Sequence, residues 1–290
     1  MNQEEIKFIQ ETEKDILRQV LKICEEHQLK YYMLGGTLLG AVRHGGFIPW
    51  DDDVDLGFPR SEYEKFITYA EEELKPPYQL HTALNDKGKY SYYYARVEDT
   101  RVLLNRSIAI KDVVIPAFVD IFPLDGVPDD IRKRKRWIRK CTFLHRLFSA
   151  SQVLYKSNNN QTHRPMKPVE KALRNVFITL RMDRMLNTKL IWKQLDKALK
   201  ENSYEESQNI INFCGHWKLK EMFPKTVYGE GKLYPFEEFM LNGPSDCDYV
   251  LSQMYGDYMK LPEESERENH HLELIRRNET KTDTPEKNHL

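Results

Sequence analysis

Residues 31–57 read Tyr31-Tyr-Met-Leu-Gly-Gly-Thr-Leu-Leu-Gly-Ala-Val-Arg-His-Gly-Gly-Phe-Ile-Pro-Trp-Asp-Asp-Asp-Val-Asp-Leu-Gly57. Near the end of this stretch Asp53 and Asp55 alternate with Val54 and Leu56, a pattern typical of a strand with one buried face. Side chains two residues apart on a strand share a face, with Cα atoms roughly 6.5–7 Å apart. We therefore expect Asp53 and Asp55 to point together into a cleft.

Two carboxylates on one strand face favour a divalent cation. They repel each other unless a cation lies between them, and Mg²⁺ and Mn²⁺ are hard ions that prefer oxygen ligands. Asp53 and Asp55 are therefore candidate metal ligands. Asp51 and Asp52 are predicted to be turn residues after Pro49-Trp50, where Asp is common. The alternative is a solvated acidic loop or an opportunistic Ca²⁺ site.

The glycine pair in the same stretch is predicted to bind phosphate. Residues 31–34 read as a short strand, and a helix that opens at Gly36-Thr37 is ended by His44-Gly45-Gly46. A helix N-terminus offers N–H groups and partial positive charge to an anion, and Gly35 lets it come close. Arg43 is a candidate for a further phosphate contact. Taken alone, a Gly-Gly pair also fits a plain turn.

These residues carry a family resemblance. Leu34-Gly-Gly-Thr37 followed by Asp53-Val-Asp-Leu56 resembles the signature of the nucleotidyltransferase superfold, and the longer text Gly36–Asp55 resembles the LicD family of phosphocholine transferases. The segments Phe118–Asp125 and Tyr255–Pro262 match that family as well.

The resemblance implies an α+β fold: a nucleotidyltransferase-like mixed sheet flanked by helices, with additional C-terminal elements. Residues 1–277 are expected to form a single catalytic domain with a mainly helical insertion at about 129–215, whereas the polar residues 278–290 are expected to be disordered. Hydrophobic patterns within the domain predict helices over residues 4–28, 61–73 and 246–255, and strands over 78–81, 92–97 and 117–122.

The resemblance also implies an activity. It is the metal-dependent transfer of phosphocholine from CDP-choline to a hydroxyl of a lipid-linked precursor of a cell-surface glycan, of the teichoic acid or lipopolysaccharide type, with release of CMP. The superfold takes a third carboxylate from a later strand, and Asp120 fits because it is the lone acid of Phe118–Phe122. A buried Asp without a partner is costly, so we expect Asp120 to face a metal or a nucleophile. The alternative is an Asp that caps a turn, the role predicted for Asp125.

A quaternary ammonium group cannot donate hydrogen bonds, so aromatic faces are expected to hold the choline. Trp50 and Phe122 are the first candidates because each lies beside a proposed metal ligand. The other available rings, which also fit a place in the core or on the surface, are Tyr92, Tyr93, Tyr94, Trp217 and Tyr228.

Two rival functions remain open at this point. One is an enzyme of the same fold that transfers a nucleotide from a nucleoside triphosphate or another phosphoalcohol, such as phosphoribitol or phosphoethanolamine. The other is a non-catalytic regulator that binds metal or nucleotide.

Composition limits the partners. A net charge of −1 argues against general nucleic-acid binding. The sequence has no apolar run of membrane-spanning length, and its first residues do not resemble a signal peptide. We therefore expect a cytoplasmic protein. Peripheral contact with the inner face of the membrane is expected through Arg132–Arg146, a basic helix whose alternative is a solvated face.

Overall fold

The computed structural model describes residues 2–85, 92–106, 113–155, 168–263, 267 and 272–277. Its α-helices are α1 (Gln3–Glu26), α2 (Gly35–His44), α3 (Arg60–Glu73), α4 (Ile131–Ser151), α5 (Pro168–Thr179), α6 (Thr188–Leu199), α7 (Lys225–Tyr228) and α8 (Cys247–Tyr255). Short 3-10 helices are η1 (Val153–Tyr155), η2 (Met182–Met185) and η3 (Lys218–Glu221). The strands are β1 (Tyr32–Met33), β2 (Asp55–Pro59), β3 (Tyr78–His81), β4 (Ala95–Arg106), β5 (Val113–Val127), β6 (Asn209–Ile211), β7 (Met222–Pro224), β8 (Lys232–Phe236), β9 (Phe239–Gly243) and β10 (Leu272–Arg277). The expected disordered tail, residues 278–290, lies outside the described residues.

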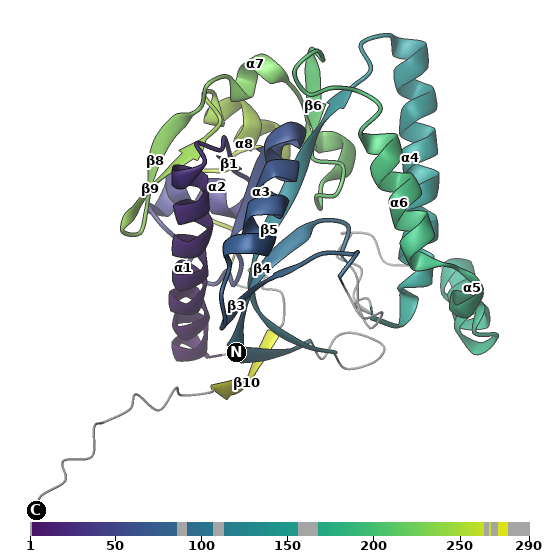
Figure 1. Ribbon diagram of the computed structural model, residues 1–290, viewed down its shortest axis with the longest axis horizontal. Helices are drawn as coiled ribbons and strands as arrows, with labels where there is room; N and C mark the ends of the chain where they lie inside the picture. Colours follow the sequence, from purple (N-terminus) through teal and green to yellow (C-terminus); the bar gives the residue numbers. More distant parts are fainter. Residues whose placement is uncertain are drawn as a thin grey trace, which may run out of the picture.

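A mixed sheet forms the centre of the molecule (Figure 1). Within the described ranges it has eight strands, ordered β1-β2-β5-β4-β10, with β3 on β4 and with β6 between β5 and β7. β2 and β5 run parallel, whereas β4 is antiparallel to β5. β8 and β9 form a separate antiparallel hairpin. A mixed sheet flanked by helices confirms the predicted α+β class.

Helices α1 and α3 cover one face of this sheet (Figure 1). In β2, Leu56 and Phe58 are fully buried, and the Phe58 ring packs on Phe66 of α3 with 5.0 Å between centroids. Successive strand side chains point to opposite faces, so Asp55 projects to the face away from α3. The predicted alternation is confirmed, although the strand begins at Asp55 and not at Asp53.

The predicted local elements are present with shifted ends. α1 begins at a capping box in which Asn2 and Glu5 bond each other's backbone N–H. The strand expected over 92–97 begins at Ala95 and continues to Arg106. It is longer because β4 pairs with β3, β5 and β10 along its length, a set of long-range contacts that local sequence patterns do not report.

Asp125 is not a turn residue, so that prediction was wrong. It lies in β5 with no exposed surface, and its carboxylate accepts hydrogen bonds from Arg60 Nε (2.6 Å) and Nη2 (2.9 Å). Arg60 Nη1 also donates to Asp196 of α6. Burial lowers the pKa of the Arg60 guanidinium, but the Asp125 charge more than offsets this and raises it, so the guanidinium stays charged. This ion pair joins the sheet to α3 and α6.

Arg60→Met is expected to lower the free energy of unfolding by about 3–5 kcal/mol, because it leaves the buried Asp125 charge without its guanidinium. Urea unfolding followed by circular dichroism measures the change. The matched control is Arg18→Met, which breaks the exposed pair of Arg18 with Asp15 and is expected to cost less than about 1 kcal/mol. Equal effects in the two variants would contradict a stabilising role for the buried pair.

Helices α4 and α6 pack against each other beside the sheet (Figure 1). Trp137 of α4 donates from Nε1 to the Ala198 carbonyl of α6 at 2.7 Å, and Cys141, Leu144 and Phe148 continue the buried stripe of α4. After α6, β6 returns to the sheet by pairing with the end of β5. None of the helices in the described ranges is both long enough and apolar enough to cross a membrane.

Candidate active site

The N-terminus of α2 is the first part of the site. Leu34 is the N-cap and its side chain makes no cap hydrogen bond, and Gly35 has a φ of +48°. That left-handed conformation favours glycine. The first N–H groups of a helix have no partners within the helix and carry a partial positive charge. The structure confirms a helix that begins at the glycine pair, and anion binding there stays a prediction.

Two aspartates face this glycine pair. A Cβ placed on Gly36 would lie 2.6 Å from Asp51 Oδ2, and one placed on Gly35 would lie 3.3 Å from Asp55 Oδ2. A larger residue at position 36 would collide with the Asp51 carboxylate. Asp51 was predicted to be only a turn residue. Its N–H does close a turn onto the Ile48 carbonyl, but its side chain belongs to the site.

Thr37 connects the helix to the strand. Its buried hydroxyl oxygen accepts a hydrogen bond from the Asp55 N–H at 2.8 Å, and the Leu34 N–H donates to the Asp55 carbonyl. These bonds hold the first residue of β2 against the first turn of α2. Direct contact of Thr37 with a substrate stays a prediction.

Asp55 and Asp120 are brought together by the sheet. They are Cα partners in the parallel pair of β2 and β5, and the Asp120 N–H donates to the Val54 carbonyl. Partners in register point to the same face. Asp53 is half-buried and lies in the irregular segment that precedes β2. Strand pairing thus brings Asp55 and Asp120 together, whereas Asp53 lies in the segment before β2. Metal binding by the three carboxylates stays a prediction.

Arg96 is a site residue that the sequence analysis missed. From β4 its Nε and Nη2 donate to the two carboxylate oxygens of Asp120, the second over 3.2 Å. The guanidinium carbon lies 3.4 Å from the Tyr92 ring centroid and 3.6 Å from that of Phe118, and Arg96 is only 4% exposed. Asp120 therefore faces a fixed cation within the protein. The register of β4 against β5 brings Arg96 and Asp120 together, so no local sequence motif predicts the pair.

The C-terminal part of the chain places two aromatic side chains beside the glycine pair. The Tyr255 hydroxyl lies 3.8 Å from the Cβ position of Gly35, and Trp217 meets the Tyr255 ring at 82° with 5.6 Å between centroids. Burial and the neighbouring Asp51 charge raise the pKa of Tyr255 above its ordinary value, so the phenol stays protonated. The sequence feature that could have identified Tyr255 as a site residue is its place in the Tyr255–Pro262 motif.

The other predicted substrate-binding residues contact neighbours within the protein. Arg43 is at the other end of α2, about 10 Å along the axis from Gly36, and donates to the Tyr258 carbonyl at 2.8 Å. Arg267 lies over the half-buried Trp50 ring, 4.7 Å from its centroid. Phe122 is buried against Tyr94, with ring centroids 4.1 Å apart. Their contacts with substrate stay predictions.

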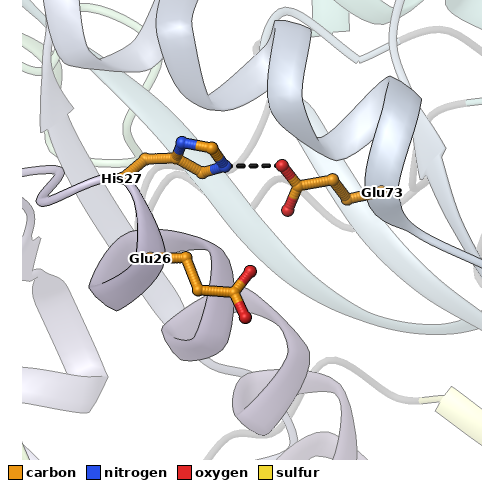
Figure 2. Close-up of side chains that lie close together, drawn as sticks. All are labelled: Glu26, His27 and Glu73. Atoms are coloured by element: carbon orange, nitrogen blue, oxygen red, sulfur yellow. Dashed lines mark hydrogen bonds and ion pairs between the residues drawn. The ribbon is translucent and has the colours of Figure 1, made fainter.

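A separate group of potential metal ligands lies on the helical layer. Among the described residues, Glu26, His27 and Glu73 have ligand atoms within 4.8 Å of one another, and Figure 2 shows His27 Nε2 directed at the Glu73 carboxylate, 2.5 Å away. The His27 ring stacks on Tyr69, 3.5 Å between centroids. This contact joins the ends of α1 and α3 and contains none of the predicted metal ligands.

Comparisons with known proteins identify the family of this chain. A family model described as LicD/FKTN/FKRP, nucleotidyltransferase domain, matches residues 28–141. The chain is 31% identical over 255 residues to the lipopolysaccharide cholinephosphotransferase LicD of Haemophilus influenzae, which covers 87% of this chain and 90% of that protein. A 44-residue stretch is 50% identical to the human ribitol 5-phosphate transferase FKRP, covering 15% of this chain and 9% of that protein. Since the first similarity extends over most of both proteins, the chain belongs to the LicD family.

Proposed function

We propose that this protein transfers phosphocholine from CDP-choline to a hydroxyl of a lipid-linked precursor of a cell-surface glycan, with release of CMP. The observation that carries the proposal is the convergence of the Asp51 and Asp55 carboxylates on the glycine start of α2, with Asp120 beside Asp55 on the next strand. Similarity over most of the chain to a lipopolysaccharide cholinephosphotransferase supports the choice of phosphocholine and of a glycan acceptor.

The donor set fits a hard divalent cation. Asp53, Asp55 and Asp120 supply only carboxylate oxygens, the ligands that Mg²⁺ and Mn²⁺ prefer. Gly35 leaves the space beside Asp55 Oδ2 that a side chain would fill. A cation held by these residues would neutralise the charge of the diphosphate and polarise it toward attack.

The residues of the chain supply positioning and proton transfer. The first-turn N–H groups of α2 bind the diphosphate, and Arg96 fixes the orientation of the Asp120 carboxylate. Asp120 accepts the proton of the attacking sugar hydroxyl. The hydroxyl oxygen forms a bond to the choline-bearing phosphorus, the bond from that phosphorus to the CMP oxygen breaks, and CMP leaves.

The test is a product assay. Purified protein is incubated with Mg²⁺, a glycan acceptor and, separately, CDP-choline, CDP-ethanolamine, CDP-ribitol and nucleoside triphosphates, and the nucleotide product is identified. We expect CMP from CDP-choline without pyrophosphate. CMP from CDP-ribitol alone would favour the activity of the ribitol 5-phosphate transferase that shares the 44-residue stretch. Release of pyrophosphate would indicate nucleotide transfer, and no product from any donor would favour a regulator.

Trp217 and Tyr255 are stronger candidates for choline contact than Trp50 and Phe122. Their rings meet nearly at right angles, as two adjoining walls of an aromatic cage do, and Tyr255 adjoins Gly35 and Asp55. Trp217→Leu is expected to lower kcat/KM for CDP-choline by roughly 2- to 30-fold, which corresponds to about 0.5–2 kcal/mol of cation–π attraction.

Measuring kcat/KM with CDP-ethanolamine separates a loss of choline contact from a general loss of activity. A primary ammonium can also donate hydrogen bonds, so it depends less on aromatic rings. We expect a smaller loss with that donor. Trp50→Leu serves as the matched variant. If it lowers the preference for choline and Trp217→Leu does not, the choline lies at Trp50 as the sequence analysis expected.

A further inference from the structure

The segment Ile131–Leu199, the main part of the predicted helical insertion, is strongly basic although the whole molecule is nearly neutral. From Ile131 to Leu199 the sequence holds 18 Lys and Arg against three Asp and Glu, out of 44 and 45 in the whole chain. The other residues therefore hold 26 basic and 42 acidic side chains. The near-neutral net charge is therefore the sum of a strongly cationic insertion and an acidic remainder of the chain, called the body below.

Part of this positive charge lies on the exposed face of α4. Its buried stripe contains Trp137, and Lys135, Arg139 and Arg146, spaced four and seven residues apart, lie on the opposite side. All three are exposed. Cations at this spacing form one face of the helix, and their stems can lie along a surface while the charged heads contact anions.

The same insertion exposes large apolar side chains. In α5, Val169 and Val176 are 70% and 53% exposed and stand seven residues apart, on one helix face. The segment that follows exposes Leu180 (66%) and Met185 (81%). Figure 1 shows α5 near the C-terminal end of α4, opposite the end that is connected to β5. Apolar side chains thus gather at the outer tip of the cationic unit.

We infer that the insertion docks on an anionic membrane surface, with Leu180 and Met185 entering the headgroup region and the basic face of α4 contacting lipid phosphates. A helix with an apolar face and flanking cations is suited to lie at a bilayer interface, and anionic lipids attract each basic residue near the surface. Nucleic acid would match the charge but would leave the exposed valine, leucine and methionine side chains in water. A second copy would bring two cationic insertions together.

Vesicle sedimentation with the full chain tests this inference. Vesicles of phosphatidylcholine, with and without phosphatidylglycerol, are mixed with wild type, with Leu180→Asp/Met185→Asp, and with Lys135→Glu/Arg139→Glu/Arg146→Glu. We expect wild type to bind only the anionic vesicles, more weakly as salt rises. Both sets of substitutions should weaken binding by about tenfold or more.

Two matched controls place substitutions of the same kind on the body. Leu233→Asp/Met240→Asp changes side chains of the β8–β9 hairpin that are 58% and 57% exposed. Lys22→Glu/Lys65→Glu/Lys232→Glu reverses three charges away from the insertion. Both controls should bind as wild type does. Because every replaced side chain is exposed, thermal unfolding should be little changed.

Absence of binding to anionic vesicles would overturn the inference, and so would equal losses in the control variants. Binding that survives Leu180→Asp/Met185→Asp would overturn the insertion of the tip. A dimer in light scattering that these two substitutions dissociate, without vesicle binding, would assign the tip to a second copy. Vesicle binding requires no turnover, so these results stand apart from the product assay for phosphocholine transfer.

Discussion

Asp53→Ala and Asp55→Ala are each expected to lower CMP release from CDP-choline by about a thousandfold or more, because each removes a carboxylate from the proposed cation site. Binding of Mn²⁺, followed by electron paramagnetic resonance in the absence of substrate, should weaken in parallel. The free energy of unfolding should change little, because both side chains are only partly buried.

Asp15→Ala is the matched control, since it removes an exposed aspartate of α1 that pairs with Arg18. Its activity and Mn²⁺ affinity should equal those of wild type. If both site variants kept their activity, the assignment of Asp53 and Asp55 as metal ligands would be wrong. Loss of activity with unchanged Mn²⁺ affinity would instead place these carboxylates on the substrate.

Asp120→Asn is expected to reduce turnover by orders of magnitude while the KM for CDP-choline changes much less, because the charge is needed as the acceptor hydroxyl loses its proton. The ion pair with Arg96 adds a second effect. Asparagine leaves the buried guanidinium without its counter-charge, which is expected to cost about 3–5 kcal/mol of stability. Activity alone therefore cannot separate chemistry from folding.

The double variant Arg96→Gln/Asp120→Asn separates them, because it removes both charges of the pair. It should be more stable than Asp120→Asn alone. If Asp120 takes part in the chemistry, the double variant stays inactive although it is folded. If Asp120 only balances Arg96, activity returns together with stability. Steady-state CMP release and urea unfolding of the three proteins decide between these roles.

Local sequence patterns were sufficient for the centre of the site. The alternation from Asp53 to Leu56 and the glycine pair that begins α2 depend on neighbours a few residues away. The structure shows the alternating burial and the helix start, although the strand itself begins at Asp55. The motif that contains Asp120 also identified the strand that pairs with β2. Strand alternation and the start and end of helices follow from backbone geometry, so short stretches of sequence report them.

Only the tertiary structure could show which side chains meet. Asp125 lies 65 residues from Arg60, and Asp120 lies 24 residues from Arg96. Strand register and helix packing decide such contacts, and neither is encoded in local spacing. The carboxylate of Asp51 reaches Gly36, and Tyr255 reaches Gly35, for the same reason. The sequence by itself thus determined the family, the strand face and the helix start, whereas the counter-charges and the aromatic neighbours of the site were decided when distant segments packed together.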